Sequence, residues 1–129
     1  MKHYQEFSVW LDQQLSQGLP DGIVAFNFNL YEGTPDPHPN YHIELIGTDF
    51  FDENDDDWPC NEVFTTRENL FIFERTEDIS EWEKGLVFMT SLVSKYLQEG
   101  KHADKLKSVD AVGIGFVDGD LHILYRSSS

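Results

Sequence analysis

Apolar residues near the start of the chain recur at the spacing of one helix face. Tyr4, Phe7, Leu11 and Leu15 fall three or four positions apart, and mostly polar residues occupy the positions between them. This periodicity is typical of an amphipathic helix whose apolar side packs against a core. The sequence therefore predicts a helix over residues 4–15, ended by the glycine and the proline that follow.

Later segments alternate between two kinds of residue, which is the pattern of a strand with one face toward water. In residues 23–31, one face carries Val24, Phe26, Phe28 and Leu30, and the other carries Ala25, Asn27, Asn29 and Tyr31. Residues 41–48 alternate again, and a proline-rich loop over 33–40 is expected to join these two strands. A third strand is expected within residues 63–75 and is clearest at 70–73.

The clearest helical pattern covers residues 80–99. Its apolar stripe consists of Trp82, Leu86, Met89, Val93 and either Tyr96 or Leu97. Ser80 and Glu83 have the spacing of a capping box, in which each side chain accepts a hydrogen bond from a free backbone N–H. Gly100 stands where a left-handed residue commonly ends a helix.

The C-terminal part of the chain predicts a β-hairpin. Two alternating runs, VDAVGIGFV and DLHILYR, flank Asp118-Gly119, a pair typical of a two-residue hairpin turn. In the first run, one face carries Val112, Ile114 and Phe116, and the other carries Gly113, Gly115 and Val117. The two glycines are expected to let a helix pack closely on their face.

These elements follow one another in the order α-β-β-β-α-β-β. The strands come in antiparallel runs and the helices are separate from them. We therefore expect an α+β fold with a mainly antiparallel sheet and with helices packed on one face. The chain has 129 residues, which suits a single domain over 1–129.

The negative charge of the chain excludes some classes of binding partner. There are 24 acidic and 9 basic residues, which gives a net charge of −15. Nucleic acids and anionic membranes are polyanions, so neither is expected to bind. Residues 12–83 hold 18 acidic and 2 basic side chains, so nearly all of the net charge comes from this part of the chain. Basic proteins, metal ions and small ligands remain as possible partners.

The densest acidic run is a candidate partner-binding surface. Six of the nine positions 49–57 are acidic, and aromatic residues flank them. One interpretation is a solvated loop that Phe50 or Phe51 and Trp58 anchor to the core. The other is a landing site for a basic protein, where carboxylates steer the approach and Trp58 supplies a buried anchor. The predicted partner-binding residues are Phe51, Asp52, Glu53, Asp55, Asp56, Asp57 and Trp58.

The sequence predicts neither a metal nor a cofactor. Asp52, Asn54 and Asp56 have the spacing of a calcium loop, but Asp57 and Val63 stand where that motif requires glycine and glutamate. The five histidines lack the spacing of a zinc site, although two of them, at 42 and 122, fall on predicted strands that could adjoin. No catalytic motif is present, so we expect no catalytic residues and regard an enzyme as the less favoured class.

The compartment is expected to be the cytoplasm. Cys60 is the only cysteine, so no disulfide can form within the chain, as is usual for proteins in a reducing environment. The N-terminal residues lack the uninterrupted apolar stretch of a signal peptide, and no window has the length of a membrane span.

In size, acidity and mixture of elements, and in the stretch FFDENDDDWPCNEVF, the chain resembles bacterial immunity proteins. These small acidic proteins bind and neutralise toxins, which are often basic. The resemblance implies a non-enzymatic protein of the immunity or antitoxin type that occludes a basic protein partner. Two alternatives remain: a cytosolic protein of another role, monomeric or homodimeric, whose acidity serves solubility, and a small hydrolase that uses carboxylates.

Overall fold

Three α-helices and six strands form the regular structure of residues 2–33 and 39–127, which are the residues that the computed structural model describes. The elements follow in the order α1 (Lys2–Leu15), β1 (Ala25–Glu32), β2 (Asn40–Thr48), η1 (Trp58–Cys60), β3 (Glu62–Thr65), β4 (Phe71–Glu74), η2 (Glu77–Ile79), α2 (Trp82–Glu99), α3 (Ala103–Leu106), β5 (Ala111–Phe116) and β6 (His122–Arg126), where η marks a short 3₁₀ turn.

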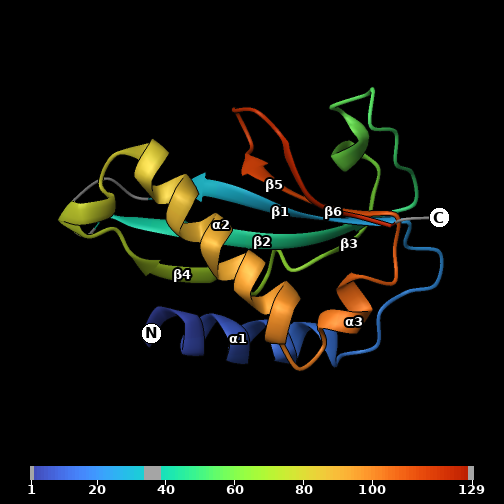
Figure 1. The fold of residues 1–129 in the computed structure, drawn as a ribbon, viewed down its shortest axis with the longest axis horizontal. Coiled ribbons are helices and arrows are strands. Elements are labelled where there is room, and N and C mark those ends of the chain that lie inside the picture. The colour runs from blue at the N-terminus through green and yellow to red at the C-terminus, as the bar shows by residue number, and fades with distance from the viewer. Residues whose placement is uncertain (1, 34–38, 128–129) are drawn as a thin grey trace.

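All six strands belong to one sheet (Figure 1). Its order is β3-β2-β1-β5-β6, and β4 also pairs with β2. β1 and β5 are parallel, and every other pair is antiparallel. The predicted α+β class with a mainly antiparallel sheet is therefore confirmed. The parallel pair places β5 beside β1, the central strand of this order.

The third predicted strand is two strands. Residues 66–69 turn the chain, with the Asn69 N–H donating to the Thr66 carbonyl at 2.8 Å. The Thr66 hydroxyl accepts from the Leu45 N–H at 2.9 Å, which ties this turn to the middle of β2. β3 then pairs with the C-terminal half of β2 and β4 with its N-terminal half. The predicted order was wrong here, because it had one strand where the structure has β3 and β4. Most of the predicted proline-rich loop lies outside the described residues.

The core contains one set of alternate residues from each central strand, together with apolar residues of the helices. The strands contribute Phe26, Phe28, Leu30, Ile43, Leu45, Val112, Ile114 and Phe116, and the helices contribute Phe7, Leu11, Leu15, Met89, Leu92, Val93 and Tyr96. Each fully buried side chain of this kind contributes about 1.5–3 kcal/mol. The Tyr96 hydroxyl also donates to Asp12 Oδ1 at 2.6 Å and so joins α2 to α1.

The ends of α2 differ from the predicted ones. The helix begins after Glu81, and no side chain caps it, so the predicted capping box was wrong. The Ser80 carbonyl instead accepts from the Arg75 guanidinium at 2.9 Å. Gly100 has φ −68°, so it is not left-handed. A Cβ at Gly100 would lie 2.6 Å from ring carbons of Tyr96, and glycine is required there for space.

The C-terminal hairpin is confirmed, but its turn is longer than predicted. β5 and β6 pair antiparallel, and residues 117–121 connect them. The Gly119 N–H donates to the Phe116 carbonyl at 2.9 Å, so Asp118 and Gly119 are the last two residues of a four-residue turn. A bulge at Val112 and Gly113 shifts the strand register, and the connection is longer than the predicted two residues.

No α-helix supplies the nearest neighbours of the two β5 glycines among the described residues, contrary to the prediction. A Cβ at Gly113 would lie 3.2 Å from the Trp58 ring, and a Cβ at Gly115 would lie 2.4 Å from the Asp120 carbonyl oxygen. The glycines thus admit an indole and the backbone of the β5–β6 connection. Both belong to the layer that carries the candidate site.

Candidate functional site

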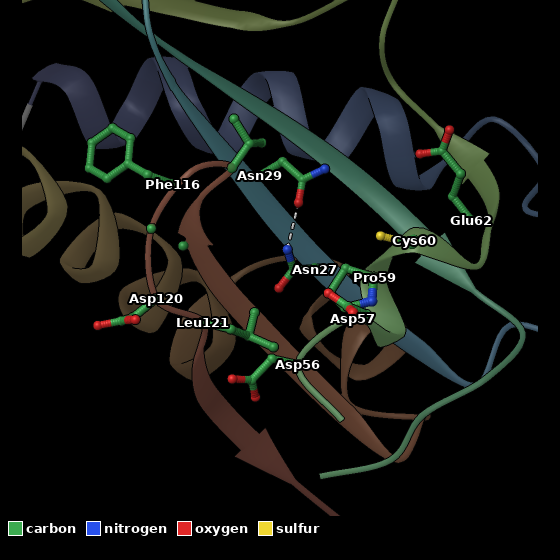
Figure 2. A pocket seen from close by; sticks show the side chains of 13 residues that line it. Asn27, Asn29, Asp56, Asp57, Pro59, Cys60, Glu62, Phe116, Asp120 and Leu121 are labelled. Atoms are coloured by element: carbon green, nitrogen blue, oxygen red, sulfur yellow. Dashed lines mark hydrogen bonds between the residues drawn. The ribbon is translucent and has the colours of Figure 1, made fainter. Parts of the chain in front are cut away.

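Polar side chains occupy the face of the sheet that is turned away from the core. On β1, Asn27 Nδ2 donates to Asn29 Oδ1 at 2.6 Å (Figure 2), and Asn29 Nδ2 donates to Glu44 Oε1 on β2 at 3.2 Å. The Tyr31 hydroxyl donates to the same carboxylate oxygen at 2.5 Å. These bonds form one chain along the neighbouring strands, and Glu44 is its common acceptor.

Glu44 is a buried carboxylate with 1% of its surface exposed. Its second oxygen accepts from the Thr65 hydroxyl, and the Arg67 Nε lies 3.7 Å away. Burying a carboxylate is costly unless donors surround it, and hydrogen bonds to a charged acceptor are the strong ones. The network around Glu44 therefore holds strands β1, β2 and β3 together on this face.

Among the donors to Glu44, Tyr31 has a hydroxyl whose pKa is raised by this environment. Burial, and then the hydrogen bond to Glu44, raise the pKa of Tyr31 to about 12. Both causes act in the same direction, because burial disfavours the charged phenolate and the hydrogen bond to Glu44 requires the protonated hydroxyl. Tyr31 thus remains a hydrogen-bond donor throughout the physiological pH range.

The acidic segment of residues 49–61 folds over part of this face, and Trp58 holds it there. Trp58 is the first residue of η1 and only 1% of its surface is exposed. Phe51 packs edge-on against it, with ring centroids 5.2 Å apart. Trp58 therefore anchors the loop to the sheet. It presents no free surface to a partner. Phe51 is half-buried, with the Arg126 guanidinium carbon 5.1 Å from its ring centre.

The five predicted acidic site residues are all exposed, namely Asp52, Glu53, Asp55, Asp56 and Asp57. Glu53 pairs with Arg126. The Asp52 carboxylate accepts from the Asn54 N–H and the Asp55 carboxylate from the Asp57 N–H, each at 2.9 Å. These side-chain bonds to the backbone stabilise consecutive turns, so the carboxylates are presented on an ordered loop.

A pocket of about 500 Å³ lies between this loop and the β5–β6 connection. Figure 2 shows Asn27 and Asn29 on β1, with Asp57, Pro59 and Cys60 to one side and Asp120 and Leu121 to the other. Two predicted site residues, Asp56 and Asp57, line this pocket, and the other five do not. The carboxylates of Glu62 and Asp120 line it as well, from parts of the chain almost sixty residues apart.

Sequence reasoning did not select Asn27, Asn29, Glu62 or Asp120 as site residues. A signal was present for the two asparagines, because they occupy the water-facing positions of an alternating strand and asparagine is depleted in strands. Nothing local distinguishes Glu62 or Asp120 from the other acidic residues. Their place at the pocket follows from the pairing of β5 with β1.

The lining of the pocket offers acceptors for hydrogen bonds and negative charge. Of the residues that the structure describes, four carboxylates line it and no lysine or arginine does. Asn27 is 2% exposed, and its Oδ1 has no donor in the part of the chain that the structure describes. A buried acceptor without a partner costs about 1–3 kcal/mol. The chemistry of the pocket is therefore suited to a group that donates hydrogen bonds and carries positive charge.

Within residues 2–33 and 39–127, no cluster of three or more histidine, cysteine, aspartate or glutamate side chains is arranged to hold a metal ion. Cys60 is a free, exposed thiol at the edge of the pocket. His42 on β2 and His122 on β6 do not meet, because β1 and β5 lie between their strands. No helix in the described chain is long and apolar enough to cross a membrane.

Comparison of the chain with protein-family models, with curated proteins and with solved structures gave no match.

Proposed function

We propose that this protein is a non-enzymatic binding protein of the immunity or antitoxin type, which occludes a basic protein partner. The observation that carries the proposal is the acidic rim of the pocket between the acidic loop and the β5–β6 connection, called the first pocket below. Asp56, Asp57 and Glu62 come from one side of it and Asp120 from the other, and an ordered loop held by a buried tryptophan presents the first two.

On the pocket rim, Glu62 pairs with Arg67 at 2.6 Å, and no lysine or arginine that the structure describes pairs with Asp56, Asp57 or Asp120. Among the described side chains, Glu53 is the only member of the predicted acidic set that forms an ion pair with a lysine or an arginine. Ordered carboxylates of one sign raise the rate at which a cationic surface is encountered, and they reject partners of the same sign. The surface therefore suits fast capture of a basic protein, which is what an antitoxin requires.

The proposed site of action is the cytoplasm. Cys60 is free and exposed, and exposed free thiols persist in reducing compartments.

The test is capture of a basic protein from the source cells, followed by binding kinetics with the purified partner. The variant Asp55→Asn/Asp56→Asn/Asp57→Asn is compared with the matched variant Asp21→Asn/Glu68→Gln/Asp104→Asn, which removes three exposed charges elsewhere. We expect only the first variant to associate more slowly than the parent. That deficit should shrink as salt rises, because exposed charges are screened beyond about 8 Å at physiological ionic strength.

Equal association rates for the two variants would contradict the proposed surface, since the loss would then follow net charge alone. Thermal unfolding of both variants serves as the control for folding. A captured partner that is acidic, or that is processed chemically by the protein, would contradict the proposed class.

A further inference from the structure

A second concave surface adjoins the first pocket. It is a groove of about 570 Å³ between the start of α2 and the β5–β6 connection. Phe116, Gly119 and Asp120 line both depressions, so the connection forms the ridge between them. None of the residues predicted from the sequence as partner-binding lines the groove.

The floor of the groove is apolar and includes an exposed aromatic ring. Trp82 is 50% exposed, and its indole packs edge-on against Phe116 with centroids 6.3 Å apart. Val87 is 70% exposed and Leu86 is half-buried. The contact with Phe116 leaves half of the Trp82 surface accessible. Tryptophans in such positions are frequent anchors of protein interfaces.

Carboxylates surround this apolar floor. Among the described residues, Glu32, Glu83, Asp118 and Asp120 line the groove, and no lysine or arginine does. Glu32 pairs with Arg75 at 3.3 Å. No ion pair joins Glu83, Asp118 or Asp120 to any lysine or arginine side chain that the structure describes. The groove thus combines an aromatic surface with at least three carboxylates that lack a cationic partner.

We infer that this groove binds an arginine side chain of the basic partner, with the guanidinium against the Trp82 indole and its N–H groups toward the carboxylates of Glu83, Asp118 and Asp120. The inference rests on the proposed function and adds the chemistry of recognition to it. Arginine fits better than lysine, because a planar guanidinium stacks on an aromatic ring while it donates two parallel hydrogen bonds to a carboxylate. Trp82, and not Trp58, is then the aromatic anchor of the interface.

The three tryptophans provide a direct readout. Trp10 and Trp58 are buried and Trp82 is half-exposed, so three indole N–H resonances report on three different environments. The full chain, labelled with ¹⁵N, is titrated at physiological salt with acetylated tri-arginine amide and, in parallel, with the tri-lysine equivalent. Trp82→Phe assigns the resonance by removing it.

We expect tri-arginine to shift the Trp82 indole resonance and to leave those of Trp10 and Trp58 in place. Tri-lysine should bind more weakly. Trp82→Ala should weaken tri-arginine binding about two- to fivefold, the fold-change of an exposed cation–π contact. Trp82→Phe should retain part of the affinity. Glu83→Gln/Asp118→Asn/Asp120→Asn should weaken binding more than Asp21→Asn/Glu68→Gln/Asp104→Asn, which removes the same number of charges.

The outcomes separate this inference from the function on which it rests. If tri-arginine shifts only backbone amides of residues 52–57, or if tri-lysine shifts the Trp82 resonance equally, the guanidinium groove is overturned while the acidic landing surface stands. If the Trp82 response persists but the Asp55/Asp56/Asp57 variant associates with the captured partner as fast as the parent, the landing surface is overturned and the groove stands. Binding is measured on the parent chain, and Trp82→Phe serves only to assign the resonance, so a binding variant that misfolds leaves the comparison of tri-arginine with tri-lysine intact.

Discussion

Two buried residues organise the polar face of the sheet by different physical chemistry. Glu44 is a carboxylate whose charge is stabilised by hydrogen bonds from Asn29, Tyr31 and Thr65. Trp58 is an apolar ring that packs beside Gly113, where a Cβ would lie 3.2 Å from the indole. Glu44 joins neighbouring strands. Trp58 fastens an acidic loop whose carboxylates repel one another.

Trp58→Ala should destabilise the fold by about 3–5 kcal/mol, the usual cost of truncating a buried tryptophan. Trp82→Ala is the matched comparison, since the same truncation at a half-exposed ring should cost much less. Urea unfolding followed by far-UV circular dichroism measures both. Similar midpoints for the two variants would show that Trp58 does not anchor the loop.

Because the pKa of Tyr31 is raised, part of the free energy of unfolding should be lost at alkaline pH. The protonated hydroxyl is favoured in the folded state, so its contribution is fully present below the ordinary pKa of 10.0 and is lost as pH rises through about 12. Tyr31→Phe has no proton to lose, so its urea midpoint should fall less steeply than that of the parent over this interval. Parallel curves for the two proteins would contradict the assignment.

Helix α2 shows how one element meets the sheet and the loops at once. Its buried residues, Met89, Leu92, Val93 and Tyr96, lie toward its middle and C-terminal end, whereas Trp82 is exposed at its start. Gly85 lies where the helix passes the Tyr41 side chain of β2, and the Tyr41 hydroxyl donates to the Ile79 carbonyl at 2.8 Å. A small residue at this position allows the helix to approach the sheet.

Gly85→Ala should destabilise the protein although alanine is the better helix former. A Cβ at this position would lie 2.3 Å from the Tyr41 hydroxyl oxygen. Overpacking typically costs about 1–3 kcal/mol, which outweighs a propensity gain of about 1 kcal/mol. Gly119→Ala is the control, because its nearest neighbour would be 3.5 Å away, an ordinary contact. A higher urea midpoint for Gly85→Ala would show that the Tyr41 side chain can move aside without destabilising the fold.

At the scale of the whole molecule, seven carboxylates from separate parts of the described chain line two adjoining depressions. The first pocket lies under residues 56–62, the second lies beside α2, and the β5–β6 connection separates them. A net charge of −15 opposes folding by self-repulsion, so neutralising exposed carboxylates should stabilise the fold.

The variant Asp55→Asn/Asp56→Asn/Asp57→Asn should therefore be more stable than the parent at low ionic strength. We expect a gain of roughly 0.5–1 kcal/mol in total, since each exposed charge interaction contributes a few tenths. Urea midpoints at increasing sodium chloride concentration should converge, because salt screens the repulsion. A gain that persists at high salt would assign the effect to something other than charge.

The local pattern of the chain was sufficient to locate most elements. Alternation identified β1 and β2, helical spacing identified α1 and α2, and two alternating runs around a turn identified the final hairpin. These features depend on near neighbours, so they can be read from sequence. The division between β3 and β4 was missed, because both pair with β2 and the turn between them is fixed by Thr66 against that strand.

The sequence by itself determined the composition of the acidic loop, its flanking aromatic residues and the fold class. Only the tertiary structure decided that Trp58 is buried, that Asp120 faces Asp56 and Asp57 across a pocket, and that Trp82 is the tryptophan left half-exposed. The physical reason is that burial depends on which segments pack together. β5 pairs with β1 across more than eighty residues of chain, and that parallel pairing brings the two acidic loops to one face.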